Sequence, residues 1–532
     1  MHRLFIISIL EILLFTNFLV LSQTNLNNWA KLYEEPRSDV LHCLLPLPNG
    51  DMILGGWTNA DVASGENILL IRINQDGNIL WQYSYGGSEL DYAQVLAHCI
   101  DNNIIVGGHT RSFGAGSTDI FLLKVDQNGN ILWQKAYGTY DDNAIASLIP
   151  TDDGGFIVGG WSYLGAGRSH DAVIFKTDSD GNIIWQKHYG TENYEGIKDI
   201  IKSNDGNYIF LGLTSSEQTQ FDILIAKIDS NGNIIWKKSI AGPRYENPIS
   251  IVNNNGSYYI VGSSDSFSSD SSKDIFLIAL DNDGNFLWGL NYPDDFETYL
   301  VSSCKLEPNK IVTIGSALPK NSQINDMLVA IFDFEGEFII GKLFSGLDNE
   351  LGYALTSSPT NYILAGGYSY SFTNGNSDIL LISTDESLYI PPGEVQSSDF
   401  ILTSKPFKIY PSIQNPDIIV DTNNVLTVSE VESTTSNPNL TCRNLNFAST
   451  VKKWGESCKV AVRATPNGIE ITLSSELPRS ATIRISNLLG QEVSNILLTN
   501  HQYKYVPTRN FKPGVYFIII EEYNLRIPFL VY

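Results

Sequence analysis

Acidic side chains recur at an almost constant interval along the first two thirds of the chain. Seven equivalent positions hold five carboxylates, one amide and one hydroxyl: Asp39, Asp91, Asn143, Glu195, Glu246, Thr298 and Glu350. A ring of carboxylates would offer the oxygen ligands that calcium prefers. The alternative, which we favour, is that each side chain caps its own loop by accepting backbone N–H bonds.

Aromatic side chains form a second series, either directly after pairs of small residues such as Gly107-Gly108 or, like Tyr163 and Tyr370, in the loops that follow. The ligand-binding candidates are Trp57, His109, Trp161, Tyr163, Tyr368 and Tyr370. Aromatic faces beside a few polar groups suit a sugar ring. Packing between loops is the favoured alternative.

No catalytic signature accompanies these two series. The seven histidines lack the spacing of metal ligands, and no Gly-x-Ser-x-Gly elbow is present. The sequence therefore favours a non-catalytic binding or adhesion protein whose ligand is a glycan or a surface protein. An extracellular enzyme acting on a polysaccharide or quinone-linked substrate, and a structural spacer, are the alternatives. No cofactor is expected, and calcium is the one ion left open.

The elements that position these residues follow from an internal repeat. Its clearest copies are Asp76–Trp81, Asn128–Trp133, Asp180–Trp185, Asn231–Trp236 and Asp283–Trp288, with a degenerate copy at Glu335–Ile340. Each unit of about 52 residues contains four β-strand signals, which is typical of a propeller blade. An Asp-Gly or Asn-Gly turn joins the third and fourth strands, and we expect φ > 0 at both central residues.

The two ends of the array predict seven blades. Six units are complete, whereas a seventh has three strands and no Trp strand after it. The isolated strand around Trp29 supplies the missing fourth strand, which closes the ring and removes its open edges. The predicted fold is all-β: a seven-bladed β-propeller closed by an N-terminal strand, followed by a small C-terminal β-sandwich.

The Gly-Asn-Ile-Leu-Trp strand in four-stranded units resembles the pyrroloquinoline-quinone-type propeller repeats of exported bacterial proteins. The resemblance covers roughly residues 29–385. It carries over the fold but not the cofactor of a quinone dehydrogenase.

The N-terminus and the charge constrain the location and the partners. Residues 1–22 have a positive start, an apolar middle and a small exit residue, as a signal peptide does. A membrane anchor is the alternative; after cleavage no membrane span is expected. The net charge is 34 − 58 = −24 without a basic cluster, which argues against a nucleic-acid partner.

The C-terminal third begins after a linker at 386–405, and residues 23–385 form the propeller. Tyr410-Pro411, residues 483–493 and residues 512–518 (Lys-Pro-Gly-Val-Tyr-Phe-Ile) resemble the C-terminal sorting domain of the type IX secretion system of Bacteroidetes. The resemblance implies a sorting domain at 406–532, with its core at 466–532, that contacts the secretion machinery. It also implies a secreted protein or one on the outer-membrane surface; a generic terminal sandwich is the alternative.

Two of the five cysteines, Cys442 and Cys458, are close enough in sequence to be disulfide candidates. A bridge between them would close a short loop and contribute roughly 3 kcal/mol.

Overall fold

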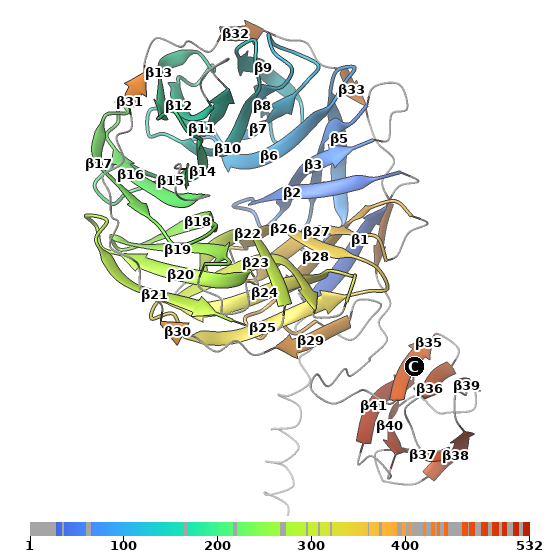
Figure 1. Ribbon diagram of the computed structural model, residues 1–532. Coiled ribbons are helices and arrows are strands. Elements are labelled where there is room, and N and C mark those ends of the chain that lie inside the picture. The colour runs from blue at the N-terminus through green and yellow to red at the C-terminus, as the bar shows by residue number, and fades with distance from the viewer. Residues whose placement is uncertain are drawn as a thin grey trace, which may run out of the picture.

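The computed structural model is a ring of seven four-stranded antiparallel blades (Figure 1). It describes residues 28–34, 37–59, 65–163, 169–215, 221–266, 273–293, 296–306, 309–319, 322–359, 361–371 and 375–390, together with the backbone of short strands between 396 and 531. The described residues contain no α-helix and no helix that could cross a membrane. The predicted signal peptide lies outside them.

The first four blades follow one another along the chain. Blade 1 has β2 (Asp39–Pro46), β3 (Met52–Thr58), β4 (Asn67–Ile73) and β5 (Ile79–Gly86). Blade 2 has β6 (Asp91–His98), β7 (Ile104–Thr110), β8 (Asp119–Val125) and β9 (Ile131–Gly138). Blade 3 has β10 (Asn143–Pro150), β11 (Phe156–Tyr163), β12 (His170–Thr177) and β13 (Ile183–Gly190). Blade 4 has β14 (Glu195–Lys202), β15 (Tyr208–Thr214), β16 (Asp222–Ile228) and β17 (Ile234–Ile240).

The remaining three blades complete the ring. Blade 5 has β18 (Glu246–Asn254), β19 (Ser257–Ser264), β20 (Asp274–Leu280) and β21 (Phe286–Tyr292). Blade 6 has β22 (Phe296–Leu306), β23 (Lys310–Pro319), β24 (Asp326–Asp333) and β25 (Phe338–Ser345). Blade 7 has β26 (Glu350–Ser357), β27 (Ile363–Ser369), β28 (Asp378–Thr384) and β1 (Trp29–Glu34). In blade 7, β1 pairs antiparallel with β28, from Trp29 opposite Ser383 to Tyr33 opposite Ile379. Both the seven-blade count and the closure by the N-terminal strand are confirmed.

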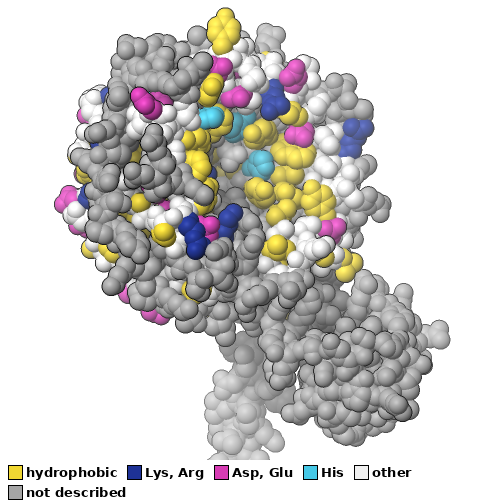
Figure 2. All heavy atoms as spheres, viewed as in Figure 1, with side chains coloured by type: hydrophobic (Ala, Val, Ile, Leu, Met, Phe, Trp, Pro, Cys, Tyr) yellow, Lys and Arg dark blue, Asp and Glu magenta, His cyan; other side chains and the backbone are white. Residues whose placement is uncertain are grey.

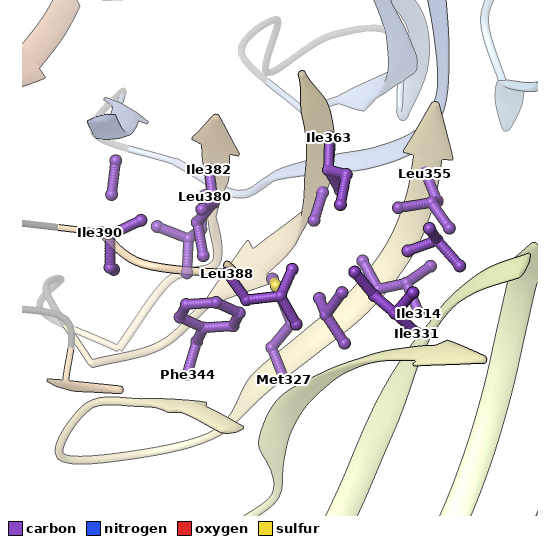
Figure 3. Packing of buried hydrophobic residues seen from close by; sticks show 14 of the residues in the cluster. Ile314, Met327, Ile331, Phe344, Leu355, Ile363, Leu380, Ile382, Leu388 and Ile390 are labelled. Carbon is purple, nitrogen blue, oxygen red and sulfur yellow. The ribbon is translucent and has the colours of Figure 1, made fainter. Parts of the chain in front are cut away.

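The hydrophobic core lies between the blades. The central strands read as nearly continuous apolar runs because both of their faces are covered. Figure 3 shows the core between blades 6 and 7, where Met327 and Phe344 of blade 6 meet Leu355 and Leu380 of blade 7.

Tyrosine and tryptophan side chains of the outer strands bond several blades to the next one around the ring. Tyr137 Oη donates to the carbonyl oxygen of Gly181 at 2.6 Å, and Trp133 Nε1 donates to that of Ser179 at 3.2 Å. The same tyrosine bond recurs from Tyr33, Tyr85 and Tyr189. The recurring Trp motif therefore builds the scaffold.

The turns between third and fourth strands differ in detail from the prediction. Gly129 has φ +83°, but no other residue of its turn has a positive φ. The Gly129 N–H donates to the Asp126 carbonyl at 3.0 Å, and the next strand begins with a bulge. A three-residue turn with one left-handed glycine thus replaces the expected two-residue turn with two positive φ values. Asp126 Oδ1 accepts the N–H groups of Asn128 and Asn130 at 2.8 and 2.9 Å, so side-chain capping organises the turn.

Six short strands between residues 396 and 444 lie along the outside of the ring (Figure 1). Each of them extends one blade antiparallel at the outer edge: β29 (Gln396–Phe400) on β25, β30 (Lys405–Pro406) on β21, β31 (Ile419–Asp421) on β13, β32 (Thr427–Glu430) on β9, β33 (Thr434–Ser436) on β5 and β34 (Thr441–Asn444) on β1. We call these six strands the outer belt. It supplies partners for edge strands that would otherwise present open hydrogen-bonding groups. This pairing has no counterpart among the features predicted from the sequence.

The backbone farther along the chain forms two more antiparallel sheets. One contains β35 (Val460–Thr465), β36 (Gly468–Leu473) and β39 (Tyr503–Pro507). The other contains β37 (Ser480–Asn487), β38 (Glu492–Thr499), β40 (Gly514–Ile520) and β41 (Leu525–Val531). Their side chains lie outside the described residues, so the predicted sandwich and the Cys442–Cys458 disulfide stay predictions.

Candidate functional site

A β-bulge interrupts the innermost strand of every blade at the same place. In each case one residue has no partner on the neighbouring strand: His42, Gln94, Ala146, Lys198, Ile249, Val301 and Tyr353. A bulge redirects a side chain relative to its neighbours and is common beside functional sites. The fold therefore contains a ring of seven redirected positions.

The paired small residues of the second strand make room for this bulge. A Cβ on Gly160 would lie 1.8 Å from the carbonyl oxygen of Ala144, and one on Gly367 would lie 1.7 Å from that of Leu351. Such contacts are far inside van der Waals distance, so only glycine fits where the two backbones approach. The repeated Gly-Gly pair is thus the sequence signature of the bulge.

Six of the seven bulged residues line a cavity of about 250 Å³ at the axis of the ring: His42, Gln94, Ala146, Lys198, Ile249 and Tyr353. A larger cavity of about 600 Å³, lined by residues of blades 2 to 5, adjoins it. The two cavities share Gln94, Ala146, Lys198 and Ile249 as lining residues, and we call them together the axial funnel. Figure 2 shows histidine and hydrophobic side chains gathered around the central hollow.

Aromatic rings line the funnel in two groups. In the first, Tyr92 stacks on His109 with 4.6 Å between ring centroids. The Tyr92 ring also contacts His42. The ring centroids of His42 and Tyr353 lie 5.5 Å apart. Tyr353 stacks on Tyr368 at 5.4 Å, so these contacts run from blade 2 through blade 1 to blade 7.

The second aromatic group belongs to blades 3 and 4. His170 lies between Trp161 at 4.6 Å and Tyr194 at 5.2 Å, and Tyr163 contacts it at 5.3 Å. Trp161 and Tyr194 both line the larger cavity and are partly exposed to it. That cavity therefore lies between rings of the two groups: Tyr92 and His109 on one side, Trp161 and Tyr194 on the other.

The charged groups of the funnel lie close to the bulge of blade 4. Asp199 accepts hydrogen bonds from Ser147 Oγ at 3.2 Å and Ser250 Oγ at 3.0 Å, and from two backbone N–H groups. Its carboxylate therefore links blades 3, 4 and 5. Burial lowers the pKa of the neighbouring Lys198, which has no hydrogen-bond or ion-pair partner within the described ranges. At the rim, Arg111 Nε donates to Thr118 Oγ1 at 3.3 Å.

The two funnel histidines contribute no positive charge at neutral pH. Burial lowers the pKa of His109 to about 4, helped by the nearby His42. Burial also lowers the pKa of His42, although a bond to the Ala93 carbonyl partly opposes this shift. Lys198 and Arg111 are therefore the cationic groups among the described lining residues.

The structure separates the predicted aromatic candidates. His109 and Trp161 line the larger cavity together. Tyr163, Tyr368 and Tyr370 line neither cavity. Tyr368 stacks on Tyr353, which lines the axial cavity, whereas Tyr163 contacts His170 and Tyr370 contacts Tyr368. Trp57, which occupies in blade 1 the position of Trp161 in blade 3, lines neither cavity.

The predicted acidic positions are buried within their own blades. Asp39, Asp91, Glu195, Glu246 and Glu350 have at most 1% of their surface exposed. Four of them accept the N–H of the residue four positions earlier: Gly87 to Asp91 at 2.8 Å, Thr191 to Glu195 at 2.7 Å, Gly242 to Glu246 at 3.0 Å, and Gly346 to Glu350. Within the described part of the chain, no three His, Cys, Asp or Glu side chains are grouped to hold a metal. These bonds are those of the local-capping alternative, and calcium binding stays a prediction.

Two of these buried carboxyls make stability depend on pH. Burial raises the pKa of Glu246 and of Glu350 from 4.5 to about 7. Between pH 4.5 and pH 7 each carboxyl is protonated in the folded state but ionised in the unfolded state. The contribution of the two carboxyls to the free energy of unfolding is therefore complete below about pH 4.5 and disappears as pH rises through 7. We expect the double variant Glu246→Gln, Glu350→Gln to lose less stability than the wild type between pH 5 and pH 8.

Urea unfolding at several pH values measures this difference. His109 acts in the opposite direction, because its folded pKa is below the 6.5 of a free histidine, so the wild-type curve alone does not isolate the carboxyls. The exposed Glu192→Gln is the control for the change of charge. Parallel pH profiles for the double variant and the wild type would contradict the prediction.

Sequence reasoning missed Tyr92, Gln94, Tyr194 and Lys198. Three of them lie on innermost strands, and Gln94 and Lys198 come thirteen residues after Trp81 and Trp185. The residue type at this bulged position changes from blade to blade, so no motif marks it. Its one signal is the facing pair of small residues.

Comparison with known proteins supplies the cellular location. Residues 465–527 match the family described as a secretion system C-terminal sorting domain. The protein is exported. It goes to the cell surface or the extracellular space, and its sorting domain interacts with the secretion machinery. The predicted location is thereby confirmed.

A second match concerns the propeller. Residues 47–79 match a β-propeller domain of unknown function (DUF5122), whereas the resemblance to pyrroloquinoline-quinone-type repeats is not confirmed. The search of curated proteins found no match.

Several solved structures share distant similarity with this exported protein. A protein of unknown function from Dyadobacter fermentans is 10% identical, with 68% of this chain and 98% of that chain covered and a TM-score of 0.38. The α-L-arabinofuranosidase of Fusarium graminearum is 11% identical, with 58% and 98% covered and a TM-score of 0.36. A subtype N11 neuraminidase-like protein from a flat-faced bat virus is 12% identical, with 55% and 88% covered and a TM-score of 0.37. At such distance the function has to be argued from the site itself.

Proposed function

We propose that this exported propeller is a non-catalytic binding protein that holds a glycan in the axial funnel. The observation that carries the proposal is the larger cavity, where Trp161, Tyr194 and Tyr92 are gathered with Gln94 and Lys198. Its volume of about 600 Å³ is that of a small-molecule site. Aromatic faces cover the apolar faces of a sugar ring, while the amide and the ammonium bind its oxygens.

We also propose how the protein is exported and where its domains begin and end. A signal peptide at residues 1–22 directs the chain out of the cytoplasm, and the type IX route carries it across the outer membrane of a Bacteroidetes cell. Residues 23–385 then form the displayed binding domain, residues 386–405 the linker, and residues 406–532 the sorting domain.

A binding panel tests the proposed function. The full chain is titrated by calorimetry against neutral and acidic oligosaccharides, with calcium and with EDTA. We expect at least one glycan to bind with a Kd between about 1 μM and 1 mM, equivalent to about −8 to −4 kcal/mol. A melting temperature and an affinity unchanged by EDTA would rule out the calcium ring but not the glycan site.

Two outcomes of the panel contradict the proposal. No heat of binding for any glycan would reject the glycan site altogether. Release of shortened or modified sugar during the titration, detected by mass spectrometry, would show an enzyme in place of a binding protein.

A further inference from the structure

We propose that the glycan bound in the axial funnel is acidic, and that Lys198 binds its carboxylate where the two cavities meet. This inference rests on the proposed function and specifies the class of its ligand. The proposed ligands contain uronic acids, which are sugars that carry a carboxylate on the ring.

Lys198 lies where the two cavities meet. The bulge in β14 leaves Lys198 without a partner on β15, and its side chain lines both the axial cavity and the larger one. No other Lys or Arg among the described residues lines both cavities. A ligand that lies against Trp161 and Tyr194 would therefore meet this ammonium group at its inner end.

The scaffold does not require a lysine at position 198. The equivalent bulged residue is Ala146 in blade 3 and Ile249 in blade 5, and both blades keep the same bulge. Lys198 is partly buried, and an ammonium withdrawn from water normally has a partner because desolvation of its charge is costly. Within the described ranges Lys198 makes no hydrogen bond or ion pair, and both oxygens of the adjacent Asp199 already accept hydrogen bonds from Ser147 and Ser250.

The negative net charge of the chain and the local positive charge of Lys198 act on an anionic ligand in opposite directions. The chain carries a net charge of −24, which by itself repels an anion. Such long-range repulsion is screened within about 8 Å at physiological salt, whereas a desolvated contact is screened much less. The other charged groups at the funnel are Arg111 and Asp142 at the rim and Asp199 within the wall. A charge-assisted bond from Lys198 can therefore select an anionic sugar despite the acidic surface.

A pair of matched ligands and a pair of matched variants test the inference. The ligands are an oligogalacturonate and its methyl ester, which share one skeleton but differ in charge. The variants are Lys198→Met, which keeps the length of the side chain, and Lys202→Met as the control. Lys202 lies on the same strand but is exposed and pairs with Asp152 at 2.6 Å, so both variants change the net charge equally.

The expected result is a loss specific to one ligand and one variant. Wild-type protein should bind the oligogalacturonate at least about 10-fold more tightly than the ester, as one charge-assisted bond provides. Lys198→Met should weaken the acid by about 10- to 100-fold and leave the ester within about threefold, whereas Lys202→Met should change neither. Lys198→Arg should keep the preference for the acid, which shows that the effect comes from charge and not from misfolding.

Failure of this inference differs from failure of the proposed function. Equal affinity of the wild type for the acid and the ester, or an unchanged preference in Lys198→Met, would reject the role of Lys198 while the glycan site stands. Binding of sulfated glycans without binding of oligogalacturonate would reject the carboxylate. Absence of binding to every glycan of the panel would reject the proposed function itself.

Discussion

Gly160→Ala should lower the free energy of unfolding by about 3 kcal/mol, the largest effect on stability that we expect from a single methyl group. The added Cβ would lie 1.8 Å from the carbonyl oxygen of Ala144. This oxygen belongs to the backbone, so it cannot move aside by a change of rotamer as a side chain can. The two strands have to separate, which breaks the ladder on both sides of the bulge. The midpoint of urea unfolding, followed by tryptophan fluorescence, measures the loss.

Gly206→Ala is the matched control for this substitution. Gly206 has φ +81°, but a Cβ added there meets no atom within 4 Å. The control therefore carries only the cost of a left-handed alanine, about 1 kcal/mol. Equal midpoints for Gly160→Ala and Gly206→Ala would show that the close approach of the strands does not limit residue 160.

Trp161→Ala should weaken glycan binding by about 30-fold or more while it changes stability little. Trp161 is only partly buried, and it lines the larger cavity beside Tyr194. A large aromatic side chain in a central pocket commonly contributes about 2 kcal/mol or more to binding. Calorimetric titration with the best ligand of the glycan panel measures the change.

Trp57→Ala provides an internal control for the loss at Trp161. Trp57 follows the Gly55-Gly56 pair of blade 1 just as Trp161 follows the glycine pair of blade 3, but it lines neither cavity. Binding should survive in Trp57→Ala. If the two variants lost affinity equally, the ligand would contact Trp57 as well as Trp161 and would not be confined to the funnel.

The architecture of the propeller was predictable because its determinants are local and repeated. The Trp strands that contain Trp81, Trp133 and Trp185 each identify one blade in the sequence. The strand at Trp29, which has no blade before it in the sequence, indicates how the ring closes. The structure gives these residues the roles of scaffold: the indole of Trp133 and the hydroxyl of Tyr137 bond the next blade. Repetition therefore identified what holds the ring together.

The candidate site was only partly predictable because it depends on what differs between blades. His109 and Trp161 were foreseen as aromatic candidates, whereas Tyr92 and Lys198 were not. A bulge has no composition of its own, so the sequence does not show that residue 198 points to the axis while residue 199 bonds its neighbours. The axial cavity is lined by residues from distant repeats, such as His42 and Lys198, and no local pattern encodes that arrangement.

The outer belt was unpredictable for a different reason. Its strands are two to five residues long and share no repeated motif, so their pairing comes from the edges that they meet and not from their own sequence. Edge strands such as β13 and β25 offer free backbone groups to any extended segment of suitable reach.

Closure by β1 has a consequence for the order of folding. Trp29 pairs with Ser383, so the first and last parts of the propeller must meet before blade 7 exists. Contacts this far apart in sequence form slowly, because the intervening chain must first be organised. During synthesis and export, six blades can assemble one after another, but the ring stays open until its two ends join. The diameter of the ring, and with it the funnel enclosed by the seven inner strands, is settled only at that final step. The axial cavity, which His42 of blade 1 and Tyr353 of blade 7 both line, is therefore complete only when the ring has closed.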